Sequence, residues 1–180
     1  IPLPVAMGVG IVAGGICGLV SGFLITRFEV PPFIATLAMM SVARGLANMI
    51  TDGQQIVGFP EWFNDLASVK FGGVLTVTVA LMIVIVIVAW VFQRFTTGGR
   101  SIYAIGGSKE VARLAGINVK RTTLWVYGTA AALAGTAGIV LAARLDSVQP
   151  SSGLTYELDT IAAVVIGGTS LTGGQGGIGG

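Results

Sequence analysis

Long stretches of the chain contain apolar residues and no charge, and these stretches predict membrane-spanning helices. A spanning helix needs about 20 mainly apolar residues. Three stretches, at about residues 3–25, 72–92 and 122–143, meet this requirement without a single charged side chain. A fourth, at about 33–50, is interrupted by Arg44. We therefore expect an all-α fold, a polytopic bundle of transmembrane helices.

Residues 156–180 have a different pattern. Only the run from Ile161 to Ile166 is densely apolar, and eight glycines then fall between Gly167 and Gly180. This pattern predicts a broken or re-entrant helix that runs into irregular backbone. Inside a bilayer such backbone must be buried in protein or line a cavity. The glycine-rich part lacks the Lys-Ser/Thr ending of a phosphate-binding loop, so we expect no nucleotide there.

Composition supports a membrane protein and gives little material for catalysis. The chain is 53% hydrophobic and 10% charged, whereas about a quarter of the residues of a soluble domain are charged. No basic patch is interleaved with aromatic residues, which disfavours nucleic-acid binding. One cysteine and no histidine make a nucleophile pair or a zinc site implausible. Glu157 and Asp159 are two positions apart and point to different helix faces, so we expect no catalytic residue, metal or bound cofactor.

The distribution of charge predicts the orientation of the helices. The segment 94–121 carries six basic residues and one acid, Glu110. The loops 51–70 and 144–159 carry more acids than bases. Because cytoplasmic loops are enriched in Lys and Arg, we expect the segment 94–121 to be cytoplasmic and both acidic loops to lie outside.

A short helix is predicted within the cytoplasmic segment. Gly106 and Gly107 are expected to break the chain, and Ser108 is a favourable N-cap for a helix from Lys109 to Ala115. Glu110 lies in the first turn, where the helix dipole favours an acid. Gly116 is placed to end the helix in a left-handed conformation, and Ile117 could then fold back onto Val111 or Ala112.

One face of this helix is apolar, with Val111, Leu114 and Ala115 at helical spacing. Such a face could dock on a partner protein. Alternatively, Lys109 and Arg113 could hold the helix on the anionic surface of the bilayer. The residues alone leave both interpretations open.

The spacing Glu110-x-Ala112-x3-Gly116 resembles the EAA loop of ABC-importer permeases, with Val111 where that motif has its second alanine. Three longer stretches resemble the ribose/xylose/galactose-type sugar permeases in the same order along the chain, namely "PPFIATLAMMSVARGLANMITDGQQI", "GRSIYAIGGSKEVARLAGINVKR" and "YELDTIAAVVIGGTSLTGGQGGIGG".

The resemblance implies a permease subunit of an ATP-driven monosaccharide importer in the bacterial inner membrane. It implies that the short helix couples to a cytoplasmic ATP-binding-cassette subunit, which hydrolyses the ATP. A second permease copy and an extracytoplasmic sugar-binding protein are the other implied partners, besides the lipid bilayer. Family members are longer, so we expect the chain to be a fragment. The coupling residues implied are Ser108, Lys109, Glu110, Ala112, Arg113 and Gly116.

Arg44 is the most costly residue within a predicted span, at about 2.5–3.5 kcal/mol on insertion scales. It needs water or a partner, and Asp52 and Asp159 are the candidate partners. We favour a structural ion pair that holds helices together over a direct contact with a passing sugar.

The first span contains glycines at every fourth position, namely Gly10, Gly14, Gly18 and Gly22. Such a stripe permits close approach of a neighbouring helix. We favour helix packing inside one subunit over a moving or intersubunit contact.

Two other functions remain open. One is a branched-chain amino-acid-type ABC permease. The other is an ion-coupled secondary transporter, for which intramembrane acids or histidines are typical, whereas the predicted spans contain Arg44 and no acid.

Overall fold

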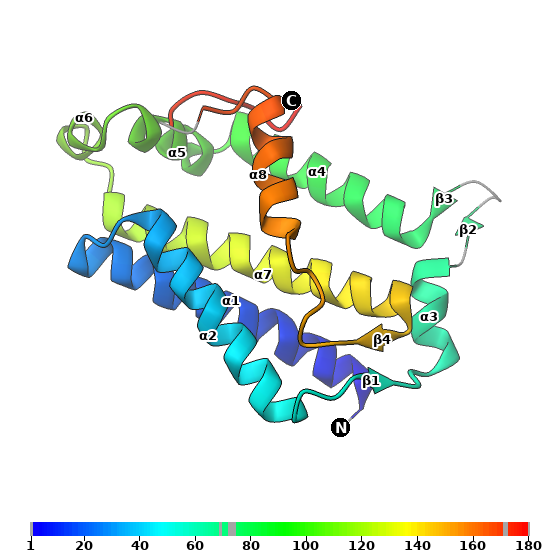
Figure 1. Ribbon diagram of the computed structural model, residues 1–180. Coiled ribbons are helices and arrows are strands. Elements are labelled where there is room, and N and C mark those ends of the chain that lie inside the picture. The colour runs from blue at the N-terminus through cyan, green and yellow to red at the C-terminus, as the bar shows by residue number, and fades with distance from the viewer. Residues whose placement is uncertain (1, 69, 72–74, 171–172, 180) are drawn as a thin grey trace. The chain divides into compact units, whose positions relative to one another are not determined.

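The computed structural model of the chain describes residues 2–68, 70–71, 75–170 and 173–179. The chain forms two compact units that alternate along the sequence, residues 1–78 with 123–152 (unit 1) and residues 79–122 with 153–180 (unit 2) (Figure 1). The described part contains four helices that are long and apolar enough to cross a membrane. The predicted all-α class is therefore confirmed.

Three long helices form most of unit 1: α1 (Leu3–Phe28), α2 (Pro32–Thr51) and most of α7 (Val119–Leu145). α1 ends where Glu29 adopts a left-handed conformation with a φ of 55°. Pro32 then occupies the first turn of α2, where a residue without an N–H leaves no hydrogen bond unmade. α1 and α2 pack against each other as a result of this tight turn.

Two short antiparallel ribbons lie in the loops of unit 1. β1 (Ile56–Val57) pairs with β4 (Ser147–Val148), and β2 (Lys70–Phe71) pairs with β3 (Leu75–Thr76). Between them lies α3 (Glu61–Ser68), a helix that the sequence did not predict. Because β1 belongs to the loop 51–70 and β4 to the loop 144–159, the parts of the two acidic loops that lie in unit 1 are joined side by side.

Unit 2 contains most of α4 (Val77–Phe95), together with α5 (Thr97–Gly107), α6 (Lys109–Leu114) and α8 (Tyr156–Ile166). The sequence did not predict α5, and it predicted a chain break at Gly106–Gly107. The structure corrects the position of this break. The Thr96 hydroxyl caps the start of α5 by accepting from the Gly99 N–H at 3.1 Å, and the break falls at Ser108.

The four long helices direct most of their apolar side chains outward. In the most apolar 18-residue stretch of each helix, at most 11% of the residues are buried within the chain, and in α4 none are. In water this exposure would be costly, whereas lipid tails solvate apolar side chains. The predicted span 72–92 begins at residues 72–74, which lie outside the described residues, and α4 itself begins at Val77.

Candidate functional site

Helix α6 is closed at its N-terminus by Ser108. The backbone of Ser108 is extended, with a φ of −161°. Its hydroxyl oxygen accepts a hydrogen bond from the Val111 N–H at 3.3 Å. The Ser108 N–H also donates to the Ala104 carbonyl at 3.1 Å, which ends α5. Ser108 is thus the single residue between the two helices, and Glu110 lies in the first turn of α6 as predicted.

The C-terminus of α6 is closed by a Schellman motif around Gly116. Gly116 has a φ of +81°, and its N–H donates to the Arg113 carbonyl at 3.0 Å. The Ile117 N–H donates to the Ala112 carbonyl, also at 3.0 Å. These are the two bonds that define the motif. They occupy carbonyls that the end of a helix otherwise leaves unpaired.

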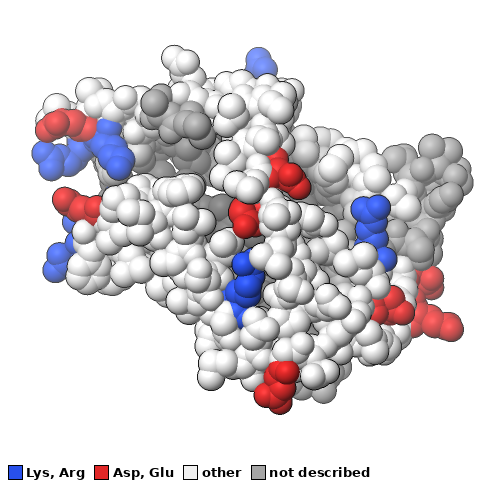
Figure 2. All heavy atoms as spheres, in the orientation of Figure 1, with Lys and Arg blue, Asp and Glu red and all other residues white. Residues whose placement is uncertain are grey.

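The two sides of α6 differ in exposure. Ala112 is 1% exposed, whereas Val111 and Leu114 are 64% and 80% exposed. Figure 2 shows basic and acidic side chains gathered over α6, at the upper left. Lys109, Glu110 and Arg113 are all exposed. The helix therefore presents two apolar side chains surrounded by charge, on a backbone fixed at both ends.

The glycine-rich segment follows α8 in the same unit. α8 ends at Ile166, and Gly168, with a φ of +82°, closes it. The Gly168 N–H donates to the Val165 carbonyl at 3.0 Å and the Thr169 N–H to the Val164 carbonyl at 3.2 Å. In the described residues, α8 is thus followed by irregular backbone.

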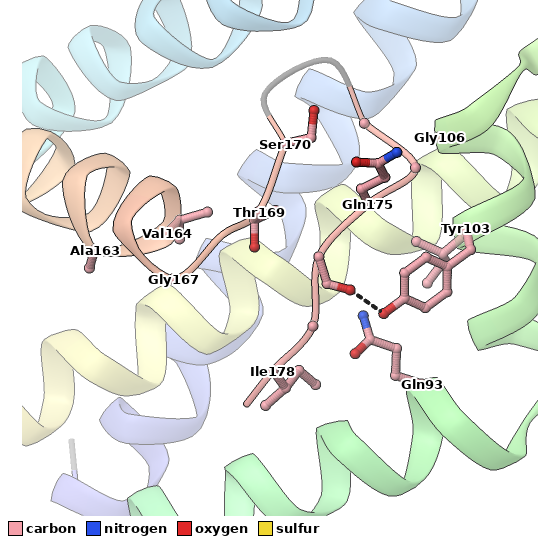
Figure 3. A pocket seen from close by; sticks show the side chains of 15 residues that line it. Gln93, Tyr103, Gly106, Ala163, Val164, Gly167, Thr169, Ser170, Gln175 and Ile178 are labelled. Carbon is pink, nitrogen blue, oxygen red and sulfur yellow. Dashed lines mark hydrogen bonds between the residues drawn. The ribbon is translucent and has the colours of Figure 1, made fainter. Parts of the chain in front are cut away.

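This segment returns to α5 and contacts it through backbone. A Cβ atom added to Gly106 of α5 would overlap the backbone N of Gly174, and one added to Gly173 would lie 2.9 Å from the Gly106 carbonyl oxygen. The Tyr103 hydroxyl donates a hydrogen bond to the Gly176 carbonyl at 2.8 Å (Figure 3). Segments 73 positions apart in the sequence therefore lie against each other here.

A hollow of about 630 Å³ lies between these elements. Its wall consists of the ends of α4, α5 and α8 and the glycine-rich segment (Figure 3). Hydrogen-bonding side chains of the lining come from Gln93, Tyr103, Thr169, Ser170 and Gln175. The described lining carries no charged side chain. Amides, hydroxyls and exposed backbone suit an uncharged polar solute better than an ion.

The two candidate partners of Arg44 belong to different parts of the fold. Arg44 lies inside α2, and Asp52 ends the same helix in a left-handed conformation with a φ of 49°. Eight helical residues span about 12 Å along the axis, a long reach for a pair on one helix. Asp159 belongs to unit 2 and Arg44 to unit 1, so their pairing stays a prediction.

The glycine stripe of the first span lies against α7 within unit 1. A Cβ on Gly14 would lie 2.8 Å from the Ala131 carbonyl oxygen. One on Gly18 would overlap the Tyr127 carbonyl, and one on Gly22 would lie 3.2 Å from a backbone atom of α7. Gly10 has more room, with the Ile139 Cδ1 at 4.0 Å. The stripe therefore faces a helix of the same chain, and its role in helix packing stays a prediction.

Tyr103, Gly106 and Gln93 are the residues that sequence reasoning missed. Tyr103 and Gly106 lie on a helix that the sequence did not predict, and their partners are distant in the sequence. The pattern "GGTSLTGGQGGIGG" indicated irregular backbone, but it carried no signal for the helix that this backbone contacts.

Comparison with known proteins gives a consistent result. The family model described as branched-chain amino acid transport system / permease component matches residues 1–176. The ribose import permease protein RbsC of Haemophilus influenzae is 41% identical over 177 residues, which are 97% of this chain and 54% of that protein. The fructose import permease protein FruG of Bifidobacterium longum is 39% identical over 192 residues, covering 98% of this chain and 54% of that protein.

A third relative is the L-arabinose ABC transporter permease protein AraH of Azospirillum brasilense. It is 39% identical over 165 residues, covering 92% of this chain and 48% of that protein. The chain thus spans about half the length of the curated relatives it matches. No solved structure shows significant similarity to it.

Proposed function

Because the chain belongs to the family of permease components of branched-chain amino acid transport systems, we propose that it is part of the multi-pass transmembrane subunit of an ATP-driven sugar importer. We further propose that α6 is the element on which the ATP-hydrolysing subunit docks. The observation that carries this proposal is α6 itself. Its backbone is closed at both ends, yet Val111 and Leu114 are left 64% and 80% exposed.

Two observations favour a monosaccharide over a branched-chain amino acid as the solute. The relatives described above are named for ribose, fructose and L-arabinose. The hollow in unit 2 has no charge in its described lining, whereas an amino acid carries an ammonium and a carboxylate that need partners. An uncharged lining fits a polyhydroxyl solute.

The partners follow from this role. A cytoplasmic ATP-binding-cassette subunit would hydrolyse the ATP, and a sugar-binding protein would deliver the solute from outside. A second copy of the permease would complete the membrane part, so each copy would present one α6 to the ATPase. ATP is consumed in the partner, and we assign no catalytic residue to this chain.

Structural features support the proposed orientation. Trp90 and Arg94 lie near the end of α4, with the Arg94 guanidinium 5.5 Å from the Trp90 ring. Such pairs are typical of membrane interfaces, and basic residues favour the cytoplasmic one. Within unit 1, Gln149 donates to Gln55 at 2.9 Å and Asn64 to Asp146 at 2.8 Å. These bonds link the two loops that we place outside.

Reconstitution tests the solute and the energy source together. The full-length permease, its ATPase subunit and its binding protein are placed in proteoliposomes and offered ribose, fructose, arabinose and the branched-chain amino acids. We expect ATP-dependent uptake of one or more sugars and no uptake of amino acids. Uptake driven by a sodium or proton gradient without ATP would establish a secondary transporter instead.

A matched pair of variants tests the docking helix. Leu114→Ser removes an exposed apolar side chain from α6. Leu154→Ser removes one that is 49% exposed in a loop placed outside. We expect the first to weaken ATPase binding by about tenfold, as loss of an interface anchor does, and the second to leave it unchanged. Equal behaviour of the two variants would refute docking at α6.

A further inference from the structure

The contact between α5 and the glycine-rich segment is made by backbone on both sides. Gly106 has room only for hydrogen where it meets Gly173 and Gly174. Gly173 and Gly174 have φ values of +92° and +76°, a region that other residues rarely adopt. A contact of this kind has no flexible side chain to absorb a displacement. Movement of α5 would therefore be passed to the segment directly.

A hydrogen bond fixes the segment one turn away from this contact. Tyr103 precedes Gly106 by three positions, so the two lie on one face of α5. Its hydroxyl donates to the Gly176 carbonyl at 2.8 Å. Gly176 also lies against Thr169, whose Oγ1 would lie 2.8 Å from a Cβ at that position. The segment is thus connected to the end of α8 as well as to α5.

The end of α5 that carries Gly106 leads directly to α6. Ser108 ends α5 and caps α6, and the two helices pack against each other. A continuous chain of rigid contacts therefore runs from α6 through α5 to the glycine-rich segment and α8. All of these elements belong to unit 2.

We propose that Tyr103 and Gly106 are positioning residues for energy coupling, which seat the segment 173–176 on α5 and so transmit displacement of α6 to the half-helix α8. This inference rests on the proposed function, in which α6 receives the movement of the ATPase. It assigns a specific role to the glycine-rich segment: it is the part of the membrane domain that the coupling helix acts on.

Adjacent glycines in α5 provide a matched pair for the test. Gly106→Ala would push a methyl group into the backbone of Gly174. For Gly107→Ala, no described atom outside its own stretch of helix lies within 4 Å of the added Cβ. Both changes replace Gly by Ala at the end of the same helix, so their effects on helix propensity are similar. Tyr103→Phe removes only the hydroxyl.

The measurement uses the full-length permease assembled with its ATPase and binding protein. It records three quantities: permease in the membrane, ATPase that co-purifies, and sugar moved per ATP hydrolysed. We expect Gly106→Ala to keep the ATPase bound and to lower sugar moved per ATP by at least about tenfold, as overpacking by one methyl group can do. Tyr103→Phe should lower it about three- to tenfold, the effect of one hydrogen bond. Gly107→Ala should stay within about twofold of wild type, because Ala favours the helix.

Each outcome either supports or overturns the proposed role of Tyr103 and Gly106. An unchanged ratio of sugar to ATP in Tyr103→Phe overturns the proposal, even if Gly106→Ala fails to accumulate. A Gly106→Ala variant that accumulates less but keeps the wild-type ratio also overturns it, since the contact is then merely structural. If the wild-type permease does not retain the ATPase, or Leu114→Ser does not weaken its binding, the proposed function of α6 fails instead.

Discussion

At Gly116 the effect of backbone conformation can be tested separately from the effect of steric clash. No described atom beyond its chain neighbours lies within 4 Å of a Cβ added to Gly116, yet its φ is +81°. A substitution there meets no clash, so its cost comes from the backbone alone. For an ordinary L-residue the left-handed conformation costs about 1–2 kcal/mol, and for a β-branched residue it is a genuine outlier.

This cost is large for α6. If residue 116 leaves the left-handed region, both closing bonds open, from the Gly116 N–H to Arg113 and from the Ile117 N–H to Ala112. Six helical residues cannot persist alone in water. Since about 1.4 kcal/mol corresponds to a factor of ten, we expect Gly116→Ala to lower the population of correctly ended α6 by roughly 5- to 30-fold. Gly116→Val should cost more, and Gly116→Asn least, because Asn tolerates this region.

The assay is co-purification of the ATPase subunit together with sugar-stimulated ATP turnover, both normalised to permease in the membrane. Membrane insertion should be unaffected, since the flanking helices are unchanged. We expect ATPase binding and sugar-stimulated ATP turnover to be highest for wild type and Gly116→Asn, lower for Gly116→Ala and lowest for Gly116→Val. If the Gly116→Val permease binds the ATPase and responds to sugar as wild type does, α6 is not the coupling element. If Gly116→Asn is as defective as Gly116→Val, the backbone conformation of residue 116 is not the cause of the defect.

The remaining predictions concern orientation and helix packing. After removal of the native cysteine, a cysteine replacing Lys109 should resist impermeant thiol reagents added outside intact cells, whereas one replacing Asp65 should react; the reverse pattern contradicts the orientation. Gly18→Ala should destabilise the packing of α1 on α7 and lower the melting temperature, by an overpacking cost of about 1–3 kcal/mol, while Gly8→Ala, with no described atom within 4 Å of the added Cβ, should not. Arg44→Ala should reduce the amount of folded permease in the membrane; a normal amount with abolished uptake would instead indicate a role in the solute path.

The sequence was informative where one local pattern determines the structure. Hydropathy located the four long helices, because the bilayer requires a minimum apolar length whatever the tertiary packing. Ser108 and Gly116 located the ends of α6, because each acts on backbone groups within five positions of itself. These features need no knowledge of distant residues.

Prediction failed where the local structure depends on contacts between residues that are far apart in the sequence. α5 contains Gly98, Gly99, Gly106 and Gly107, and glycine lowers helix propensity by about 1 kcal/mol per residue, so the sequence carried no signal for a helix there. Its helix is supported by the Thr96 cap and by contact with the glycine-rich segment. The β1–β4 ribbon was missed for the same reason, since two-residue strands carry no periodic pattern.

The alternation of the two units along the chain has a consequence for biosynthesis. Unit 1 contains residues 1–78 and 123–152, so α1 is made well before α7, the helix that its glycines contact. At about 5–20 residues per second, the ribosome needs several seconds to complete the intervening segment. During that time Gly14, Gly18 and Gly22 face lipid or the insertion machinery. Assembly of unit 1 is therefore post-insertional, and a change that slows the arrival of α7 should expose α1 to membrane proteases.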